Sequence, residues 1–139
     1  MKKVFLGSDI ILDALLARAP FHKAAISLID MAHKSYFEAV TSSEVFVNVH
    51  YFLNKLAPAT KMESLRRFRS VVLIVGVDDK VIDMALESTF KDFEDAVQYY
   101  TAEKEGCNYI ITRNAKDYKN SKISILNADQ FIQLLSNAK

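Results

Sequence analysis

Short apolar runs and helix-spaced apolar residues alternate along the whole chain. Runs rich in β-branched and aromatic residues predict strands at about 3–6, 36–40, 71–75, 108–112 and 124–126. Apolar residues three and four positions apart predict helices over about 10–16, 21–33, 44–55, 60–69, 80–88, 92–105 and 128–135. Strands that alternate with helices favour an α/β fold. We therefore expect a central, mostly parallel sheet of four or five strands with helices on both faces.

Size and composition favour one domain over residues 1–139, because half of the 139 residues are hydrophobic and two smaller domains would bury little surface. The net charge of +1 gives no electrostatic basis for strong non-specific binding to nucleic acid. The single cysteine, Cys107, cannot form an internal disulfide, which suits a reducing cytoplasm. Because no apolar run has signal-peptide or membrane-spanning length, we expect a cytoplasmic protein without membrane contact.

The most informative stretch runs from residue 91 to residue 119. Asp92 and Asp95 stand at the start of a predicted helix, and Asn114 and Asp117 follow the next predicted strand. A helix that leads into a parallel strand returns its first turn to the far end of that strand. We therefore expect these four side chains to meet and form a site for a hard metal ion. Helix capping by Asp92 and Asp95 is the alternative interpretation.

Two further polar segments follow predicted strands, at residues 7–9 and 41–44. In parallel sheets, sites form beyond the carboxyl ends of the strands. Both segments are therefore expected at the same crevice as Thr112, Arg113 and Asn114.

Residues 92–96 and 109–118, DFEDA and YIITRNAKDY, resemble the PIN domain family, in particular its toxin (VapC-like) branch. The opening VFLGSDIILD at 4–13 resembles the first strand and turn of that family. The resemblance implies a three-layer sandwich and a ribonuclease that uses Mg²⁺ or Mn²⁺ held by carboxylates. It also implies the toxin component of a toxin–antitoxin system, with RNA, a cognate antitoxin protein and a second copy of the chain as partners.

Carried over residue by residue, the resemblance assigns two groups of positions. The catalytic and metal-binding group is Asp9, Glu44, Asp95 and Asp117. The substrate-binding group is Ser8, Asn48, Asp92, Thr112, Arg113 and Asn114. For Arg113 a phosphate contact and a solvent-exposed position both stay open. The helices over 44–68 correspond to the region that contacts an antitoxin in the family. Among their aromatic residues, we expect core packing for Phe46 and Phe52 more than for Tyr51 and Phe68.

Two positions depart from the family pattern. Gly7 stands where the family has its first carboxylate, and Asn48 stands where it has its second. Asp9 is then either a replacement ligand or a helix cap, and Glu44 either a ligand or a charge that complements the helix dipole. Loss of a carboxylate removes charge and coordination together, so we expect weak or absent metal binding and slow or absent cleavage.

Two other functions compete with a ribonuclease toxin. One is a PIN-like module that binds RNA or protein without catalysis. The other is a receiver-like regulator, which needs an Asp at the end of a central strand and a Lys after a later strand. Neither 71–75 nor 109–112 supplies that arrangement, so the regulator is disfavoured.

Overall fold

The computed structural model of the protein describes residues 1–118 and 121–137, apart from the side chain of Asp117. Five strands form one sheet: β1 (Lys3–Leu6), β2 (Glu38–Ser42), β3 (Val72–Val75), β4 (Tyr109–Ile111) and β5 (Ser124–Leu126). Seven α-helices and one 3₁₀ helix join them within the described residues: α1 (Ser8–Leu15), α2 (His22–His33), α3 (Ser43–Leu56), α4 (Lys61–Arg69), α5 (Asp79–Glu87), α6 (Phe93–Lys104), η1 (Ala115–Asp117) and α7 (Ala128–Asn137).

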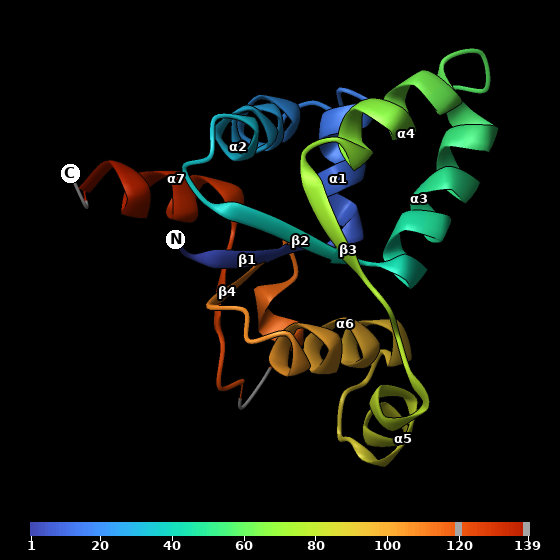
Figure 1. The fold of residues 1–139 in the computed structure, drawn as a ribbon, viewed down its shortest axis with the longest axis vertical. Helices are drawn as coiled ribbons and strands as arrows, with labels where there is room; N and C mark the ends of the chain where they lie inside the picture. The colour runs from blue at the N-terminus through green and yellow to red at the C-terminus, as the bar shows by residue number, and fades with distance from the viewer. Residues whose placement is uncertain (119–120, 138–139) are drawn as a thin grey trace.

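The sheet has the order β3-β2-β1-β4-β5, and all four strand pairings are parallel. Helices α5 and α6 lie on one side of the sheet, and α1, α2, α3, α4 and α7 lie on the other (Figure 1). The predicted α/β sandwich is therefore confirmed. The chain reverses its direction of travel across the sheet at β1 and β4, and sheets of this kind bind ligands at such a switch point.

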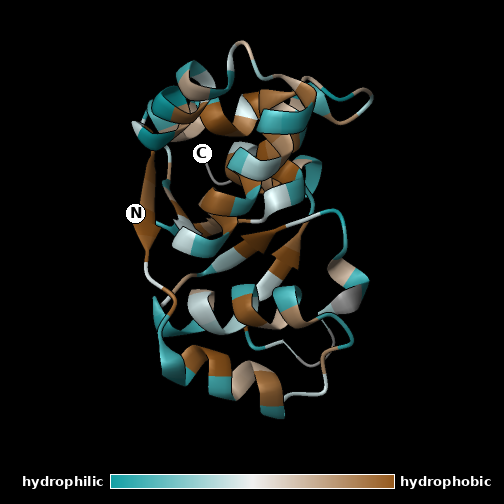
Figure 2. Ribbon diagram, turned by 90° about the vertical axis from the view of Figure 1, so that its right-hand side faces the viewer, coloured by the Kyte–Doolittle hydropathy of each residue, from teal (hydrophilic) through white to brown (hydrophobic). Residues whose placement is uncertain are grey.

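The main core lies between the sheet and the larger helix layer, and the strands are the most hydrophobic part of the ribbon (Figure 2). Phe37, just before β2, packs edge-on against Phe131 of α7 with ring centroids 5.1 Å apart, which fixes the last helix to the sheet. A smaller cluster between α5 and α6 contains Val81, Ala85, Ala96 and Val97. In the described residues, no helix is both long and apolar enough to cross a membrane.

Side-chain caps set the start of three helices. The side chains of Ser42, Asp78 and Asp92 accept hydrogen bonds from backbone N–H groups three residues later, at the first turns of α3, α5 and α6. Each cap satisfies one of the free N–H groups of a helix start. Gly106 ends α6 with φ +72°, the left-handed conformation expected of a terminating glycine.

The predicted second strand, 36–40, is two residues too early, because β2 covers Glu38–Ser42 and Tyr36 is exposed. The last two residues of β2, Thr41 and Ser42, are polar but fully buried. Thr41 can end a buried strand because its Oγ1 donates to the backbone oxygen of Leu6 at 3.1 Å. The roles of two aromatic residues are also reversed: Phe68 is buried in the core, whereas Phe52 is exposed on α3.

Candidate active site

Asp9 connects the carboxyl ends of β1 and β4. It lies in the first turn of α1, and its Oδ2 accepts the backbone N–H of Arg113 at 2.7 Å and the hydroxyl of Thr112 at 3.2 Å. Its Oδ1 accepts the N–H of Ile10 at 2.9 Å. The Thr112 Oγ1 in turn accepts the N–H of Asn114 at 3.1 Å. Asp9 is therefore not the N-cap of α1, which is Gly7, but a brace across the switch point.

Three oxygen atoms lie close to Gly7. Its N–H donates to the backbone oxygen of Ile111 at 3.1 Å, which ties β1 to β4. A Cβ atom at position 7 would lie 3.0 Å from Asp9 Oδ1, 3.3 Å from Ile111 O and 3.4 Å from Gln98 Oε1. Gly7 itself supplies no ligand, so any ligand at this point must come from its neighbours.

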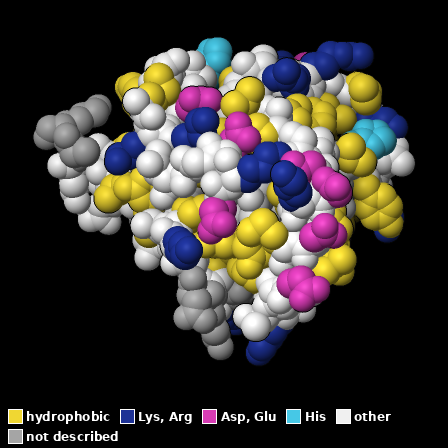
Figure 3. Space-filling view, turned by 60° about the horizontal axis from the view of Figure 1, so that its bottom comes forward, with side chains coloured by type: hydrophobic (Ala, Val, Ile, Leu, Met, Phe, Trp, Pro, Cys, Tyr) yellow, Lys and Arg dark blue, Asp and Glu magenta, His cyan; other side chains and the backbone are white. Residues whose placement is uncertain are grey.

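The start of α6 carries two of the predicted carboxylates, Asp92 and Asp95. Asp92 is the N-cap of α6, since its Oδ1 accepts the N–H of Asp95 at 2.9 Å. The capping interpretation of Asp92 is therefore confirmed. Asp95 is half-buried in the first helical turn and lies three residues before Gln98, so both occupy one side of α6. On the face that α5 and α6 form, Asp and Glu side chains line up along one side (Figure 3).

Glu44 is the second residue of α3. It lies close enough to the start of α6 for the negative charges there to act on its carboxyl. Burial raises the pKa of the Glu44 carboxyl above its usual value, and the negative charges of Glu94 and Asp92 raise it further. Three carboxylates from two helices thus lie close enough at this edge to repel one another. Asn48 lies one turn further along α3 and is half-buried.

The segment after β4 holds the remaining predicted residues. Asn114 is exposed at the start of η1, and its side chain makes no capping hydrogen bond there. Asp117 is the last residue of η1, and its side chain lies outside what the structure describes. Ser8 is half-buried as the first residue of α1.

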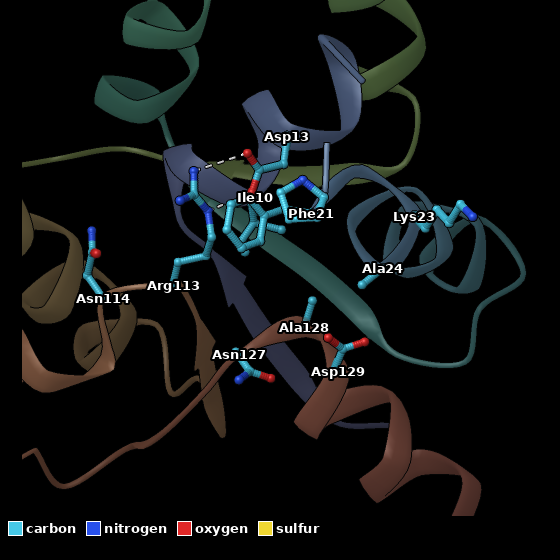
Figure 4. Close-up of a pocket in the computed structure, with 11 residues that line it drawn as sticks. Ile10, Asp13, Phe21, Lys23, Ala24, Arg113, Asn114, Asn127, Ala128 and Asp129 are labelled. Carbon is cyan, nitrogen blue, oxygen red and sulfur yellow. Dashed lines mark hydrogen bonds and ion pairs between the residues drawn. The ribbon is translucent and has the colours of Figure 1, made fainter. Parts of the chain in front are cut away.

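Arg113 is exposed in part, yet its guanidinium is held by contacts within the protein. Its Nε and Nη2 donate to Asp13 Oδ2 and Oδ1 at 2.9 and 3.1 Å, and its guanidinium lies 4.1 Å from the ring centroid of Phe21. Asp13 is fully buried and also accepts the Nε of Arg18 at 2.9 Å. Asp13, Phe21 and Arg113 border a cavity of about 390 Å³ (Figure 4). The sequence analysis missed Asp13, because no local pattern links α1 to a residue that follows β4.

The donor chemistry of this edge fits a hard divalent cation. Its side chains are carboxylates and amides, without histidine or thiolate, and oxygen ligands are those that Mg²⁺ and Mn²⁺ prefer. In residues 1–118 and 121–137, Asp117 side chain excluded, no three His, Cys, Asp or Glu side chains group closely enough to bind one metal ion.

Fold and site together define an α/β sandwich with carboxylate and amide side chains near the carboxyl ends of its parallel strands. The model of the PIN domain family matches residues 3–116. Ribonuclease VapC1 of Aquifex aeolicus is 28% identical over 137 residues, which covers 95% of this chain and 94% of that protein. The chain belongs to the PIN domain family and is VapC-like.

Solved structures agree with this assignment at the level of the fold. VapBC2 from Rickettsia felis, bound to a DNA fragment from its promoter, matches with a TM-score of 0.67 and 20% identity over 90% of this chain and 97% of that one. VapC20 of Mycobacterium tuberculosis, a toxin that cleaves the sarcin–ricin loop, matches with a TM-score of 0.62 and 16% identity over 77% and 86%.

Proposed function

We propose that the protein is the ribonuclease toxin of a toxin–antitoxin pair and cleaves RNA with the help of Mg²⁺ or Mn²⁺. The observation that carries the proposal is the environment of Glu44 at the start of α3, where burial and the negative charges of Glu94 and Asp92 raise the pKa of its carboxyl. Such a concentration of negative charge costs free energy until a cation neutralises it. The ribonuclease activity and the toxin pairing of the relatives agree with this proposal.

The residues divide into ligands and positioning groups. Asp95, Asp117, Glu44 and Asp9 would hold the cation, which lowers the pKa of a coordinated water and neutralises charge on the phosphate. We assign the exposed Asn114 and the half-buried Ser8 and Asn48 to contacts with the RNA backbone. Because Asp13 occupies the guanidinium of Arg113, we assign Arg113 to holding the β4–η1 segment and not to binding phosphate.

A binding module without catalysis is the second candidate. Gly7 and Asn48 carry no carboxylate, and both oxygens of Asp9 already accept hydrogen bonds. Under the first proposal, these features give weak metal binding and slow cleavage. Under the second, they mark a site that binds RNA or protein without cleaving it.

A protein partner would bind through α3 and α4. Five large apolar side chains on these helices are exposed: Val47, Tyr51, Phe52, Leu56 and Met62. Exposed apolar patches of this kind mark interaction surfaces, and we assign this one to the antitoxin or to the second subunit of a homodimer. A reducing, cytoplasmic location agrees with the single buried cysteine.

The test is cleavage of labelled structured RNA by the purified full chain with Mn²⁺, Mg²⁺ or EDTA. Asp95→Asn should reduce a metal-dependent rate on the order of 100-fold or more, because even outer-shell partners of metal sites contribute 10- to 100-fold. Asp83→Asn, at an exposed position of α5, is the matched control and should leave the rate unchanged. Cleavage that persists in EDTA and in Asp95→Asn would contradict the proposal. RNA binding without cleavage would favour the binding module.

A further inference from the structure

The cavity of about 390 Å³ lies where the chain leaves β4 and β5 at their carboxyl ends (Figure 4). Its walls come from α1, the start of α2, the segment after β4 and the start of α7. Arg113 connects the cavity with the proposed ribonuclease site, because its side chain borders the cavity while its backbone N–H donates to Asp9 Oδ2 at 2.7 Å. Ligand pockets of about 300–1,000 Å³ form at such sheet edges.

Phe21 and Arg113 form a stacked pair in the wall of this cavity. The guanidinium of Arg113 lies over the ring of Phe21, 4.1 Å from the ring centroid. Phe21 is 43% exposed, so solvent reaches a large part of the ring. An aromatic ring and a guanidinium both offer flat faces on which another π-system can stack. The stacked pair is therefore a platform for a flat ligand.

Asp13 fixes the orientation of the guanidinium in this platform. Its two oxygens accept Nε and Nη2 of Arg113, and its carboxylate is fully buried. These two hydrogen bonds occupy the edge of the guanidinium that would otherwise bind a phosphate in a two-point contact. A guanidinium held in this way is suited to stacking, and its fixed orientation reduces the entropy lost when a ligand stacks on it.

Polar side chains of other elements border the same cavity. Asn127 and Asp129 come from the start of α7, and Asn114 follows β4 (Figure 4). All three residues are exposed. The cavity thus combines flat apolar surface with hydrogen-bonding groups. A nucleobase has the matching chemistry, because its two faces are apolar and its edges carry donors and acceptors.

We propose that this cavity binds one unpaired nucleobase of RNA, which stacks on Phe21 and Arg113 and presents its polar edge to Asn127 and Asp129. The inference rests on the proposed function and deepens it, since it names single-stranded RNA as the substrate class of that site. Proteins that read single-stranded RNA stack its bases on aromatic rings and guanidinium planes and form hydrogen bonds with the base edges. Stacking also suits a chain with a net charge of only +1, which attracts phosphates weakly.

Asp129 makes the cavity selective among the bases. An ionised carboxylate only accepts hydrogen bonds. The Watson–Crick edge of guanine presents two adjacent N–H donor groups, whereas uracil presents one N–H between two carbonyl groups. Guanine should therefore bind better than uracil, and Asp129→Asn should reduce the difference between them.

The decisive measurement is quenching of 2-aminopurine fluorescence in a short single-stranded RNA. The full chain is added in EDTA, so that metal-dependent cleavage does not take place. Stacking in the cavity should quench the fluorescence. Phe21→Leu keeps an apolar side chain and removes the ring, so the dissociation constant should rise about 5- to 150-fold. Phe21→Tyr keeps the ring and should bind like the parent.

Tyr36→Leu is the matched control. It removes a ring that is 51% exposed and lies before β2, outside the cavity. It should bind the RNA like the parent. Thermal unfolding checks that both leucine variants are folded. A dissociation constant that Phe21→Leu leaves unchanged, or that Tyr36→Leu raises equally, would overturn the inference.

Competition with unlabelled RNAs that differ in one central base tests the edge contacts. Guanine should compete better than uracil in the parent, and the two should compete more equally in Asp129→Asn. A preference that Asp129→Asn leaves unchanged would refute the contact of Asp129 with the base edge.

RNA cleavage with Mn²⁺, assayed in parallel, separates this inference from the proposed function. A parent that cleaves RNA while Phe21→Leu binds RNA unchanged refutes the base-binding cavity alone. A parent that binds RNA through Phe21 yet cleaves none refutes the ribonuclease and leaves the cavity as an RNA-binding site. A parent that does not quench the fluorescence overturns the inference, whatever the cleavage assay shows.

Discussion

Asp13 and Arg113 form a two-point ion pair that closes the fold across 100 residues of sequence. The Nε and Nη2 of Arg113 donate to Oδ2 and Oδ1 of Asp13 at 2.9 and 3.1 Å, and the carboxylate is completely buried. Arg18 adds a third charge-assisted hydrogen bond at 2.9 Å. The pair fixes the segment after β4 against α1, beside the brace that Asp9 makes to the backbone of Arg113.

Asp13→Asn should therefore lower the free energy of unfolding by about 3 kcal/mol, at the lower end of what loss of one partner of a buried ion pair costs, since both arginines are partly exposed. Chemical denaturation measures this value. Asp30→Asn removes the carboxylate of an exposed pair with Lys34 and should cost about 0.5 kcal/mol or less. Equal effects of the two substitutions would contradict a structural role for the buried pair.

Local signals in the sequence predicted most of the fold. The apolar runs that form β1 and β5 have the predicted bounds, and the caps at Asp78 and Asp92 lie where acidic residues precede an apolar helical pattern. Such signals act within about four residues, which is the range over which a helix turn or a cap forms. They therefore show in a single sequence.

The features that the sequence did not reveal depend on contacts between distant segments. Thr41 looked like part of a helix start, yet its hydroxyl bonds to Leu6 and lets β2 continue. Asp13 resembled one more polar residue on α1. In each case the partner lies more than 30 residues away, and the spacing of apolar and polar residues along the chain does not indicate such a pairing.

Glu44→Gln tests whether Glu44 belongs to the acidic edge or complements the dipole of α3. Its pKa is raised, so the charged form destabilises the folded state, and stability should rise as the pH falls through the folded pKa. In EDTA at pH 7, Glu44→Gln should therefore raise stability, by less than about 1 kcal/mol because half of the side chain stays in solvent. It should also reduce the stabilisation by Mn²⁺. If Glu44 instead complements the dipole of α3, Glu44→Gln should lower the stability of the protein in EDTA.

Cys107 should be unreactive in the native protein. Burial raises the pKa of the Cys107 thiol to about 12, and only 7% of the residue is exposed. Since the thiolate is the reactive form, a disulfide reagent at pH 8 should label Cys107 only after unfolding. The raised pKa also means that stability falls as the pH rises above the unfolded value near 9. Rapid labelling of the native protein would contradict the buried position before β4.

The last prediction concerns Gly7→Asp, which introduces the carboxylate of the family pattern. Aspartate suits the backbone, because position 7 is the N-cap of α1 with φ −72°, so its cost comes from charge and crowding. The new Cβ would lie 3.0 Å from Asp9 Oδ1 and 3.4 Å from Gln98 Oε1. In EDTA the variant should melt below the parent through like-charge repulsion.

Added Mn²⁺ should reverse that loss, because a cation that binds only the folded state stabilises it by mass action. Gly7→Asp should therefore gain more from Mn²⁺ than the parent and cleave RNA faster. If Gln98 occupies the space that the new carboxylate needs, the double variant Gly7→Asp/Gln98→Ala should gain more still. No metal-dependent shift in either variant would mean that position 7 does not face the cation. Metal binding without cleavage would leave Asn48 as the second missing carboxylate, and Asn48→Glu in the same background would then restore activity.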